Sequence, residues 1–226
     1  METTNGDCVG HGPTGIVGAY ATNTMESNVS LEQSHHRFFI RQKLTPMVNR
    51  YVVHAAGPDG TEGEVIAFAR QKRLAFKEQV TFYTDQSARQ VLFTFKARQA
   101  VDLGATYDVC DATGILLGQF RKDFTASLLR STWQMRQAGA ATEATGKERN
   151  QGVALVRRGW HFIPLVDLVP FAWPYHFDFA EAGRPIMSVD KRLGLRDRYI
   201  LEVTAPDLDR RLAIAQAVAL DALQSR

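Results

Sequence analysis

The sequence predicts a mainly β protein, a closed antiparallel barrel of about 12 strands around a central, apolar C-terminal α-helix. Two observations support this prediction. Units of strand, turn and second strand recur along the chain, and the chain ends in a helical segment that is apolar on nearly every side. One hairpin alone is marginally stable in water, so several must pack together or close on one another. An all-round apolar helix must be buried, and the interior of a wide barrel can bury it.

The strand–turn–strand unit is clearest in residues 107–122, where an Asp-Ala-Thr-Gly turn joins two β-rich segments and the second ends in basic residues. Residues 177–191 repeat the layout, residues 82–96 form a third copy, and residues 51–72 form a looser fourth copy with a longer turn. The β pattern continues through Trp133 to Met135. Residues 137–152 are rich in Ala, Gly, Thr, Glu and Gln and lack an apolar pattern, which predicts a surface loop between two strands.

The two ends of the chain differ from this β pattern. Residues 1–33 are rich in Gly, Thr, Asn and Ser and predict a disordered leader, so the predicted barrel domain is 34–226. Near the C-terminus, only Gln216 is polar between Leu212 and Leu220, and Asp207 or Asp209 can cap the helix that this pattern predicts. A helix of about 15 residues is roughly 22 Å long, which suits the inside of a barrel.

Composition narrows the class of protein. The 226 residues include 27 Lys and Arg against 24 Asp and Glu, and a net charge of +3 is too small to predict a nucleic-acid partner. The two cysteines do not predict a disulfide, because Cys8 lies in the leader, and Cys110 is expected to be an inert core residue. The sequence shows no signal peptide and no apolar run of the roughly 18–20 residues that span a bilayer, which predicts a cytoplasmic protein without a transmembrane span.

Three stretches carry a resemblance to a known group of proteins. They are residues 39–44 followed by 51–53, residues 107–122, and residues 197–203 followed by 207–209 and the terminal helix. Their order resembles the tubby C-terminal-like superfamily, which includes tubby proteins, phospholipid scramblases and LURP-one-related proteins; the last two branches are nearest in pattern. The resemblance implies a barrel around a central helix and contact with lipid or a membrane surface. Residues 205–209 lack the ligand spacing of a calcium loop, unlike the matching stretch of some scramblases.

Strand alternation predicts one lipid-headgroup site. If Phe93 and Phe95 face inward, Lys96 and Arg98 share the outer face, where two cations can hold a phosphate. The pair resembles the basic residues with which tubby proteins bind phosphoinositides. Further clusters are expected around Arg70, Lys72, Arg73 and Lys77, and at Arg121 with Lys122. The alternative for each cluster is a solvated basic edge that discourages strand pairing.

Other polar and aromatic residues predict no metal and no cofactor. His35 and His36 are adjacent and would point to opposite faces of a strand. A metal site from His161, His176, Asp167 and Asp178 would lack cysteine and tight ligand spacing. Turn chemistry accounts for Asp102, Asp108 and Asp111, and packing accounts for Trp133, Trp160 and Trp173.

No catalytic motif occurs in the sequence, so the leading hypothesis is a non-catalytic module that binds anionic phospholipid headgroups through its basic strand face. Three alternatives remain open. The first is transfer of phospholipid between leaflets, as in scramblases. The second is a hydrolase with its site in residues 160–176. The third is a barrel that holds an apolar small molecule, for which a central helix leaves little room.

Overall fold

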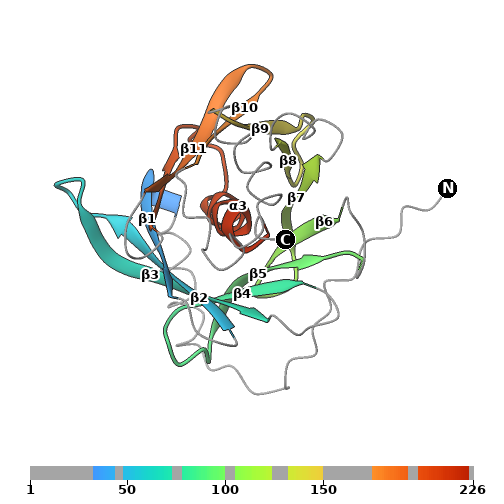
Figure 1. The fold of residues 1–226 in the computed structure, drawn as a ribbon. Coiled ribbons are helices and arrows are strands. Elements are labelled where there is room, and N and C mark those ends of the chain that lie inside the picture. Colours follow the sequence, from blue (N-terminus) through green and yellow to red (C-terminus); the bar gives the residue numbers. More distant parts are fainter. Residues whose placement is uncertain are drawn as a thin grey trace, which may run out of the picture.

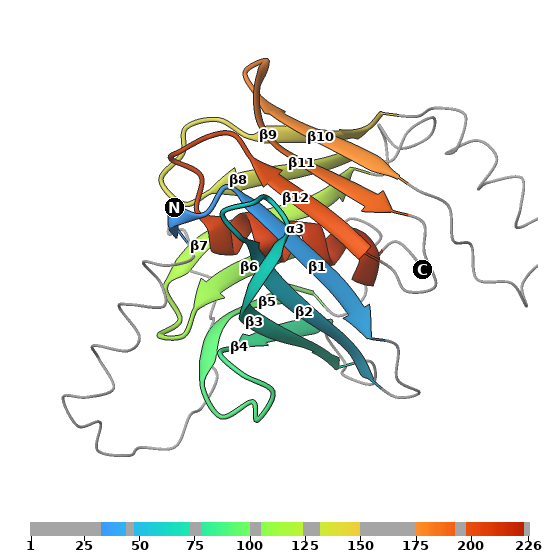
Figure 2. The same cartoon turned by 90° about the vertical axis from the view of Figure 1, so that its left-hand side faces the viewer.

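The computed structural model describes residues 33–43, 48–72, 78–99, 105–123, 132–149, 175–192 and 198–223. Within them, 12 antiparallel strands form a closed barrel, and one helix, α3 (Arg210–Ala222), lies in its interior. Viewed along its axis, α3 is surrounded by the strands (Figure 1), and from the side it runs the length of the wall (Figure 2). The predicted fold class is confirmed.

The wall follows the order of the chain, so each strand pairs with the next one, and β1 pairs with β12 to close the barrel. The strands are β1 (Arg37–Lys43), β2 (Val48–Ala56), β3 (Glu62–Lys72), β4 (Gln79–Tyr83), β5 (Val91–Ala97), β6 (Thr106–Asp111), β7 (Leu116–Asp123), β8 (Thr132–Gln137), β9 (Ala144–Glu148), β10 (His176–Glu181), β11 (Arg184–Arg192) and β12 (Arg198–Val203). The predicted hairpin units are therefore confirmed as β2–β3, β4–β5, β6–β7 and β10–β11.

Side chains alternate between the core and the outer face, as β5 illustrates. Phe93 and Phe95 are fully buried, whereas Lys96 between Phe95 and Ala97 is exposed. Phe93 stacks on Phe82 of β4 with ring centroids 4.1 Å apart. The predicted orientation of β5 is confirmed, and aromatic side chains fill much of the space between wall and helix.

The helix α3 is buried on all sides. Asp209 is its N-cap and accepts a hydrogen bond from the backbone N–H of Arg211. Leu212, Ile214 and Leu220 are fully buried, and so is Gln216. The apolar pattern therefore predicted both the helix and its burial, and Asp209 is the residue that caps it. Within the described residues, no helix is long and apolar enough to cross a membrane.

The prediction of a loop over residues 137–152 is wrong, because β9 (Ala144–Glu148) lies within it. Two of its three inward residues are small: Ala144 is buried, and a Cβ on Gly146 would lie 2.3 Å from the ring of Phe179 on β10; the third is the buried Glu148. The large neighbouring ring fills the space that a side chain of β9 would otherwise occupy. The strand thus alternates small and polar residues, and a search for large apolar residues misses it.

The expectation of an unpaired Cys110 is also wrong. Cys110 on β6 is 1% exposed, as expected for a core residue, but it is disulfide-bonded. The other cysteine of the sequence, Cys8, lies outside the described residues.

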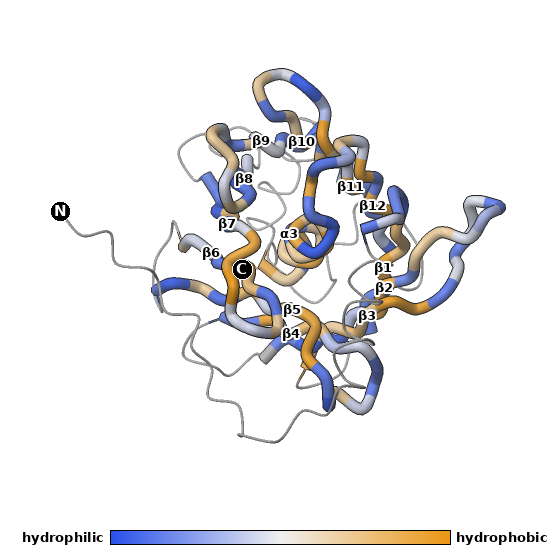
Figure 3. The backbone as a smooth tube through the Cα atoms, turned by 180° about the vertical axis from the view of Figure 1, so that it is seen from behind, coloured by the Kyte–Doolittle hydropathy of each residue, from blue (hydrophilic) through white to orange (hydrophobic). Residues whose placement is uncertain are grey.

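The barrel has two distinct ends. One end, called here the hairpin end, contains the turns of the five hairpins from β2–β3 to β10–β11 and the start of α3. The hydrophilic tip of the β2–β3 hairpin projects from it (Figure 3). At the other end, called here the loop end, β1, β3, β5, β7, β9 and β11 finish and α3 ends.

Candidate functional site

The predicted pair, Lys96 on β5 and Arg98 just after this strand, is exposed, but its two members differ. Lys96 lies opposite Gln79 on one side and Asp108 on the other. Arg98 donates two hydrogen bonds to the Asp108 carboxylate, Nε to Oδ2 at 2.8 Å and Nη2 to Oδ1 at 2.7 Å. Its Nη2 also lies 2.7 Å from Oε1 of Gln119. The hydrogen bond to Asp108 raises the pKa of Arg98, against the opposing effect of burial. The guanidinium of Arg98 is therefore bound to side chains of β6 and β7, whereas Lys96 extends into solvent.

Asp108 was interpreted from sequence as a turn residue, and that interpretation is wrong. It lies within β6, is 8% exposed and serves as the carboxylate partner of Arg98. Asp111, by contrast, is a turn residue as predicted, because its Oδ1 accepts the N–H of Thr113 at 2.8 Å and that of Ile115 at 2.9 Å. Asp102 lies outside the described residues.

The other two predicted clusters are divided by the barrel geometry. Arg121 on β7 is exposed and lies 3.5 Å from Glu143, whereas Lys122 lies opposite the buried Trp133 and so belongs to the inward row. These two cations therefore do not share a face. Lys72 ends β3, and its side chain lies outside the description; Arg73 and Lys77 lie outside the described residues altogether.

Arg70 on β3 belongs to a different group of cations, which we call the basic row: Lys43, Arg50 and Arg70. In the register of the wall, Lys43 lies directly opposite Arg50, and Arg50 lies directly opposite Arg70. Lys43 and Arg50 are exposed and Arg70 is half-buried. The guanidinium of Arg70 lies 5.8 Å from the ring centroid of Tyr83 and donates to the backbone carbonyl of Gln86 at 2.5 Å.

The basic row lines a shallow hollow of about 70 Å³ on the outer face of the wall, together with residues of β2 and β3 and with Gln86, which lies in the turn between β4 and β5. Among the ion pairs of the described residues, none joins Lys43, Arg50 or Arg70 to a carboxylate. Like charges directly opposite each other on neighbouring strands repel, so this arrangement favours binding of an anion. Sequence reasoning found only Arg70, because the row depends on pairing between three separate strands.

Basic residues continue around the wall from the basic row. Arg41 on β1 lies opposite Arg198 on β12, and Arg198 lies opposite Arg192 on β11. Arg198 and Arg192 are exposed, while Arg41 is bound to Glu62, with Nη2 to Oε2 at 2.5 Å and Nε to Oε2 at 2.9 Å. Together they form a basic face over β11, β12, β1, β2 and β3 at the loop end.

The loop end also contains a polar cluster around Asp221, near the end of α3. Its carboxylate accepts hydrogen bonds from the hydroxyls of Tyr51, at 2.9 Å, and Tyr199, and lies 3.7 Å from Nζ of Lys191. Lys191 lies over the rings of Tyr175 and Tyr199, 5.6 and 5.4 Å from their centroids. The side chains of Lys191 and Asp221 are 9% and 10% exposed, so the cluster anchors the helix inside the barrel.

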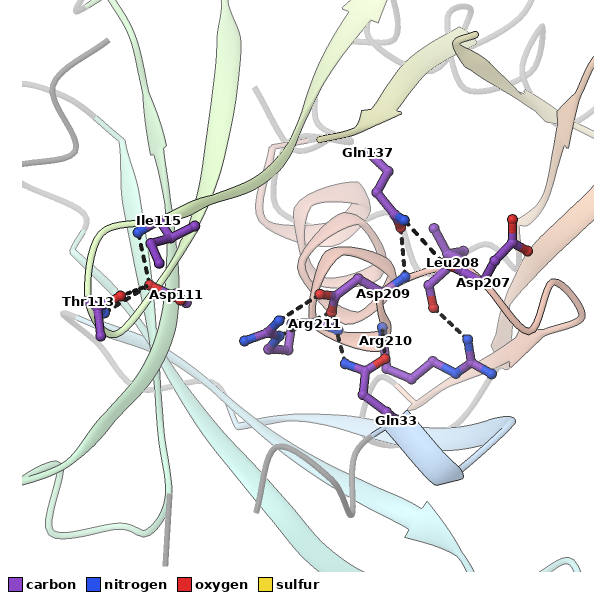
Figure 4. A network of polar contacts seen from close by, with 10 residues as sticks. All are labelled: Gln33, Asp111, Thr113, Ile115, Gln137, Asp207, Leu208, Asp209, Arg210 and Arg211. Carbon is purple, nitrogen blue, oxygen red and sulfur yellow. Dashed lines mark hydrogen bonds and ion pairs between the residues drawn. The ribbon is translucent and has the colours of Figure 1, made fainter. Parts of the chain in front are cut away.

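A second polar cluster surrounds the start of α3 at the hairpin end (Figure 4). Asp209 accepts from Nε2 of Gln33 at 3.0 Å and from Nη2 of Arg211 at 2.7 Å, and its backbone N–H donates to Gln137. Burial raises the pKa of Asp209, but the hydrogen bond and charge of Arg211 outweigh burial, so the pKa is lowered. Gln33 was assigned to the disordered leader, yet its side chain also accepts the N–H of Arg210.

The described histidines lie beside charged residues or backbone groups and do not form a metal site. Within the part of the chain that the structure describes, no three His, Cys, Asp or Glu residues could hold a metal ion together. His176 lies 2.6 Å from Asp190, and Nδ1 of His36 lies 3.1 Å from Nη2 of Arg210. Asp178 is bound to Arg149 at 2.5 Å. His161, Asp167, Trp160 and Trp173 lie outside the described residues, whereas Trp133 is buried against Phe120, as packing predicts.

This architecture defines the class of protein: a closed antiparallel barrel around a buried C-terminal helix is the tubby C-terminal-like fold. The sequence pattern of one family, LURP-one-related, matches residues 65–221, from β3 to the end of α3. The chain therefore belongs to the LURP-one-related family, which is not a known enzyme family. No curated protein matches the chain.

Proposed function

We propose that this LURP-one-related barrel is a non-catalytic module that binds anionic phospholipid headgroups at its loop end. The observation that carries the proposal is the basic row, Lys43, Arg50 and Arg70, aligned directly across three neighbouring strands. An anion placed over the row would remove the repulsion between its members. Arginine suits a phosphate because its planar guanidinium can donate two parallel hydrogen bonds, and lysine adds a point charge.

The shape and charge around the row agree with this proposal. The hollow that the row lines has a volume of about 70 Å³ and is open to the outer face, so a headgroup can enter it while its chains stay in the bilayer. The exposed Arg192 and Arg198 extend the positive charge along the same end. Each basic residue near an anionic membrane contributes about 1 kcal/mol to attraction, so a face of this kind is sufficient for peripheral binding.

The role of the predicted β5 pair changes within this proposal. Arg98 is held by Asp108, so a headgroup there would compete with a bidentate ion pair. Lys96 is two strands away from Arg70 and adds positive charge beside the row. Binding at the row is therefore expected to depend more on Arg50 and Arg70 than on Arg98.

Co-sedimentation with vesicles tests the proposal. The variant Lys43→Gln/Arg50→Gln/Arg70→Gln is compared with the control Arg89→Gln/Arg136→Gln/Lys147→Gln, which removes the same charge from exposed positions elsewhere. We expect the first variant to bind vesicles containing phosphatidylserine or phosphoinositide at least about tenfold more weakly than the control does. Binding of the unmodified protein should also fall as salt is raised.

Two results would contradict the proposal. One is equal binding of the unmodified protein to neutral and to anionic vesicles at low salt. The other is equal loss of binding in the two triple variants, since that would mean that only net charge matters.

Transfer of phospholipid between leaflets is the remaining function that the family resemblance suggested, and the structure offers less support for it. The helix α3 is enclosed by the wall, and Asp209, in the stretch compared with a calcium loop, is bound to Arg211 and Gln33. Most of the segment 160–176, suggested for a hydrolase, lies outside the described residues.

A further inference from the structure

The hairpin end contains a cavity of about 170 Å³ that lies far from the basic row. Three segments enclose it: the β8–β9 turn, the β10–β11 hairpin, and the turn between β12 and α3. Its floor consists of apolar side chains that are at most 6% exposed, namely Met135, Ala144, Ile186, Ala205 and Leu208. A ligand in this cavity would therefore place an apolar portion against the floor.

The rim of the cavity is acidic. Glu181 and Asp207 line it, together with Thr142, whose hydroxyl donates to Oε1 of Glu181 at 2.5 Å. Nη2 of Arg184 lies 3.8 Å from Oε2 of Glu181 and 3.7 Å from Oδ2 of Asp207. Both distances exceed a hydrogen bond, and the Arg184 side chain is 60% exposed, so Arg184 balances the two carboxylates only weakly.

We propose that this cavity binds a primary alkylammonium group, supplied by a lysine side chain or by a small aliphatic amine. The carbon chain lies on the apolar floor, and the ammonium lies between the carboxylates of Glu181 and Asp207, where it displaces Arg184. An ammonium has three donors and no acceptor, which matches a rim of two carboxylates. The site lies at the opposite end of the barrel from the basic row and does not depend on headgroup binding there.

The size of the cavity supports this class of ligand. An apolar cavity of about 150 Å³ is large enough for benzene, so a volume of about 170 Å³ accepts a chain of about four or five carbon atoms. The apolar floor disfavours a hydrated inorganic cation, because on the side of the floor such an ion would lose water without gaining polar partners. The two carboxylates disfavour an anionic ligand. An amine with a short aliphatic chain satisfies both parts of the cavity, as lysine does when its stem lies on apolar surface.

Titration with n-butylammonium chloride, followed by NMR on the whole chain, tests the site. We expect saturable shifts of the methyl signals of Met135, Ile186 and Leu208, and weaker or no saturation with 1-butanol, which has a similar size and no charge. Glu181→Gln and Asp207→Asn should each raise Kd about two- to fivefold, the range of exposed ion pairs. Glu64→Gln, which removes an exposed carboxylate that does not line the cavity, is the matched control and should leave Kd unchanged.

The Arg184 variant is the most discriminating test, because removal of this side chain should strengthen binding of the amine. Arg184→Gln is expected to lower Kd for n-butylammonium about two- to fivefold, while Arg136→Gln, the same charge change at an exposed residue outside the cavity, should not. A purely structural role for Arg184 would give the opposite sign. A short peptide with one lysine, tested as a competitor, distinguishes a protein lysine from a free amine as the source.

Three outcomes would overturn the inference: equal affinity for the amine and the alcohol, shifts that map away from the cavity floor, or weaker binding in Arg184→Gln. Circular dichroism of each variant confirms that it is folded, so a loss of binding cannot be ascribed to unfolding.

Discussion

The hairpin end of the barrel carries acidic turns, whereas the loop end carries basic strand ends. At the hairpin end, Asp59, Asp85 and Asp111 each accept the N–H of the residue two positions later. The hydrogen bonds of Thr61 and Ser87 lower the pKa values of Asp59 and Asp85. At the loop end, strands finish in residues such as Lys43 and Arg192. Turn chemistry thus explains the acids, whereas among the ion pairs of the described residues none joins Lys43 or Arg192 to a carboxylate.

The helix is anchored differently at these two ends. At the hairpin end, the guanidinium of Arg210 donates to backbone carbonyls of His35, Ala205, Pro206 and Leu208, so the chain folds around one side chain. At the loop end, Asp221 is held by side chains from β2, β11 and β12. The first anchor is mostly local in sequence, and the second requires strands from both ends of the chain. Assembly of the closed barrel should therefore be linked to docking of the helix C-terminus.

Replacing Arg210 should have the largest effect on stability. Arg210 is 1% exposed, and Arg210→Met would leave several buried carbonyls without donors. Each lost hydrogen bond to a charged group costs about 1.5–3 kcal/mol, and we expect a total loss of at least about 4 kcal/mol in the free energy of unfolding. Urea denaturation measures this loss. Arg192→Met, at an exposed strand end, is the control and should change stability by less than about 0.5 kcal/mol. An equal effect of both changes would show that Arg210 is not an anchor.

Replacing Asp221 should have the next largest effect. Asp221→Asn keeps an acceptor for one tyrosine but leaves the charge of the buried Lys191 without its carboxylate. We expect a loss of about 2 kcal/mol in the free energy of unfolding. Asp178→Asn also breaks an ion pair, but one whose side chains are half exposed, so it should cost less than about 1 kcal/mol. If the helix C-terminus is held mainly by apolar packing, the two variants will be equally stable.

The parts of the fold that were predicted correctly are those that local pattern determines. The apolar run from Leu212 to Leu220 predicts a buried helix without reference to its partners, and the alternation around Phe93 and Phe95 predicts which face of β5 is inside. The strand β9 was missed because Gly146 is small only to make room for Phe179, which lies 33 positions later in the chain. The reason that β9 contains a glycine therefore lies in β10 and cannot be found in the sequence of β9 itself.

The candidate site was predicted less well, because its geometry depends on strand register. Nothing in the sequence near Lys43 shows that it lies opposite Arg50, or that Arg50 lies opposite Arg70. Conversely, Arg98 appeared to be available for a ligand, but the pairing of β5 with β6 brings Asp108 within reach of it. A sequence search could look for basic residues at the strand ends of successive predicted hairpins, since those strand ends must meet at one end of an antiparallel barrel.

The smallest of these effects should come from Asp209, and it should depend on pH. The lowered pKa of Asp209 means that its carboxylate stabilises the folded state above the ordinary carboxyl value of 3.8, and that this contribution is lost as pH falls through the lower folded value. Asp209→Asn keeps a capping side chain but loses the charge opposite Arg211. We expect it to lower the free energy of unfolding by about 1 kcal/mol at about pH 7, and to approach the unmodified protein as pH falls below about 4. Urea denaturation at both values measures the difference. A deficit that stays constant with pH would mean that Asp209 acts through hydrogen-bond geometry alone, and that the start of α3, unlike the end that Asp221 and Lys191 hold, is not fixed by charge.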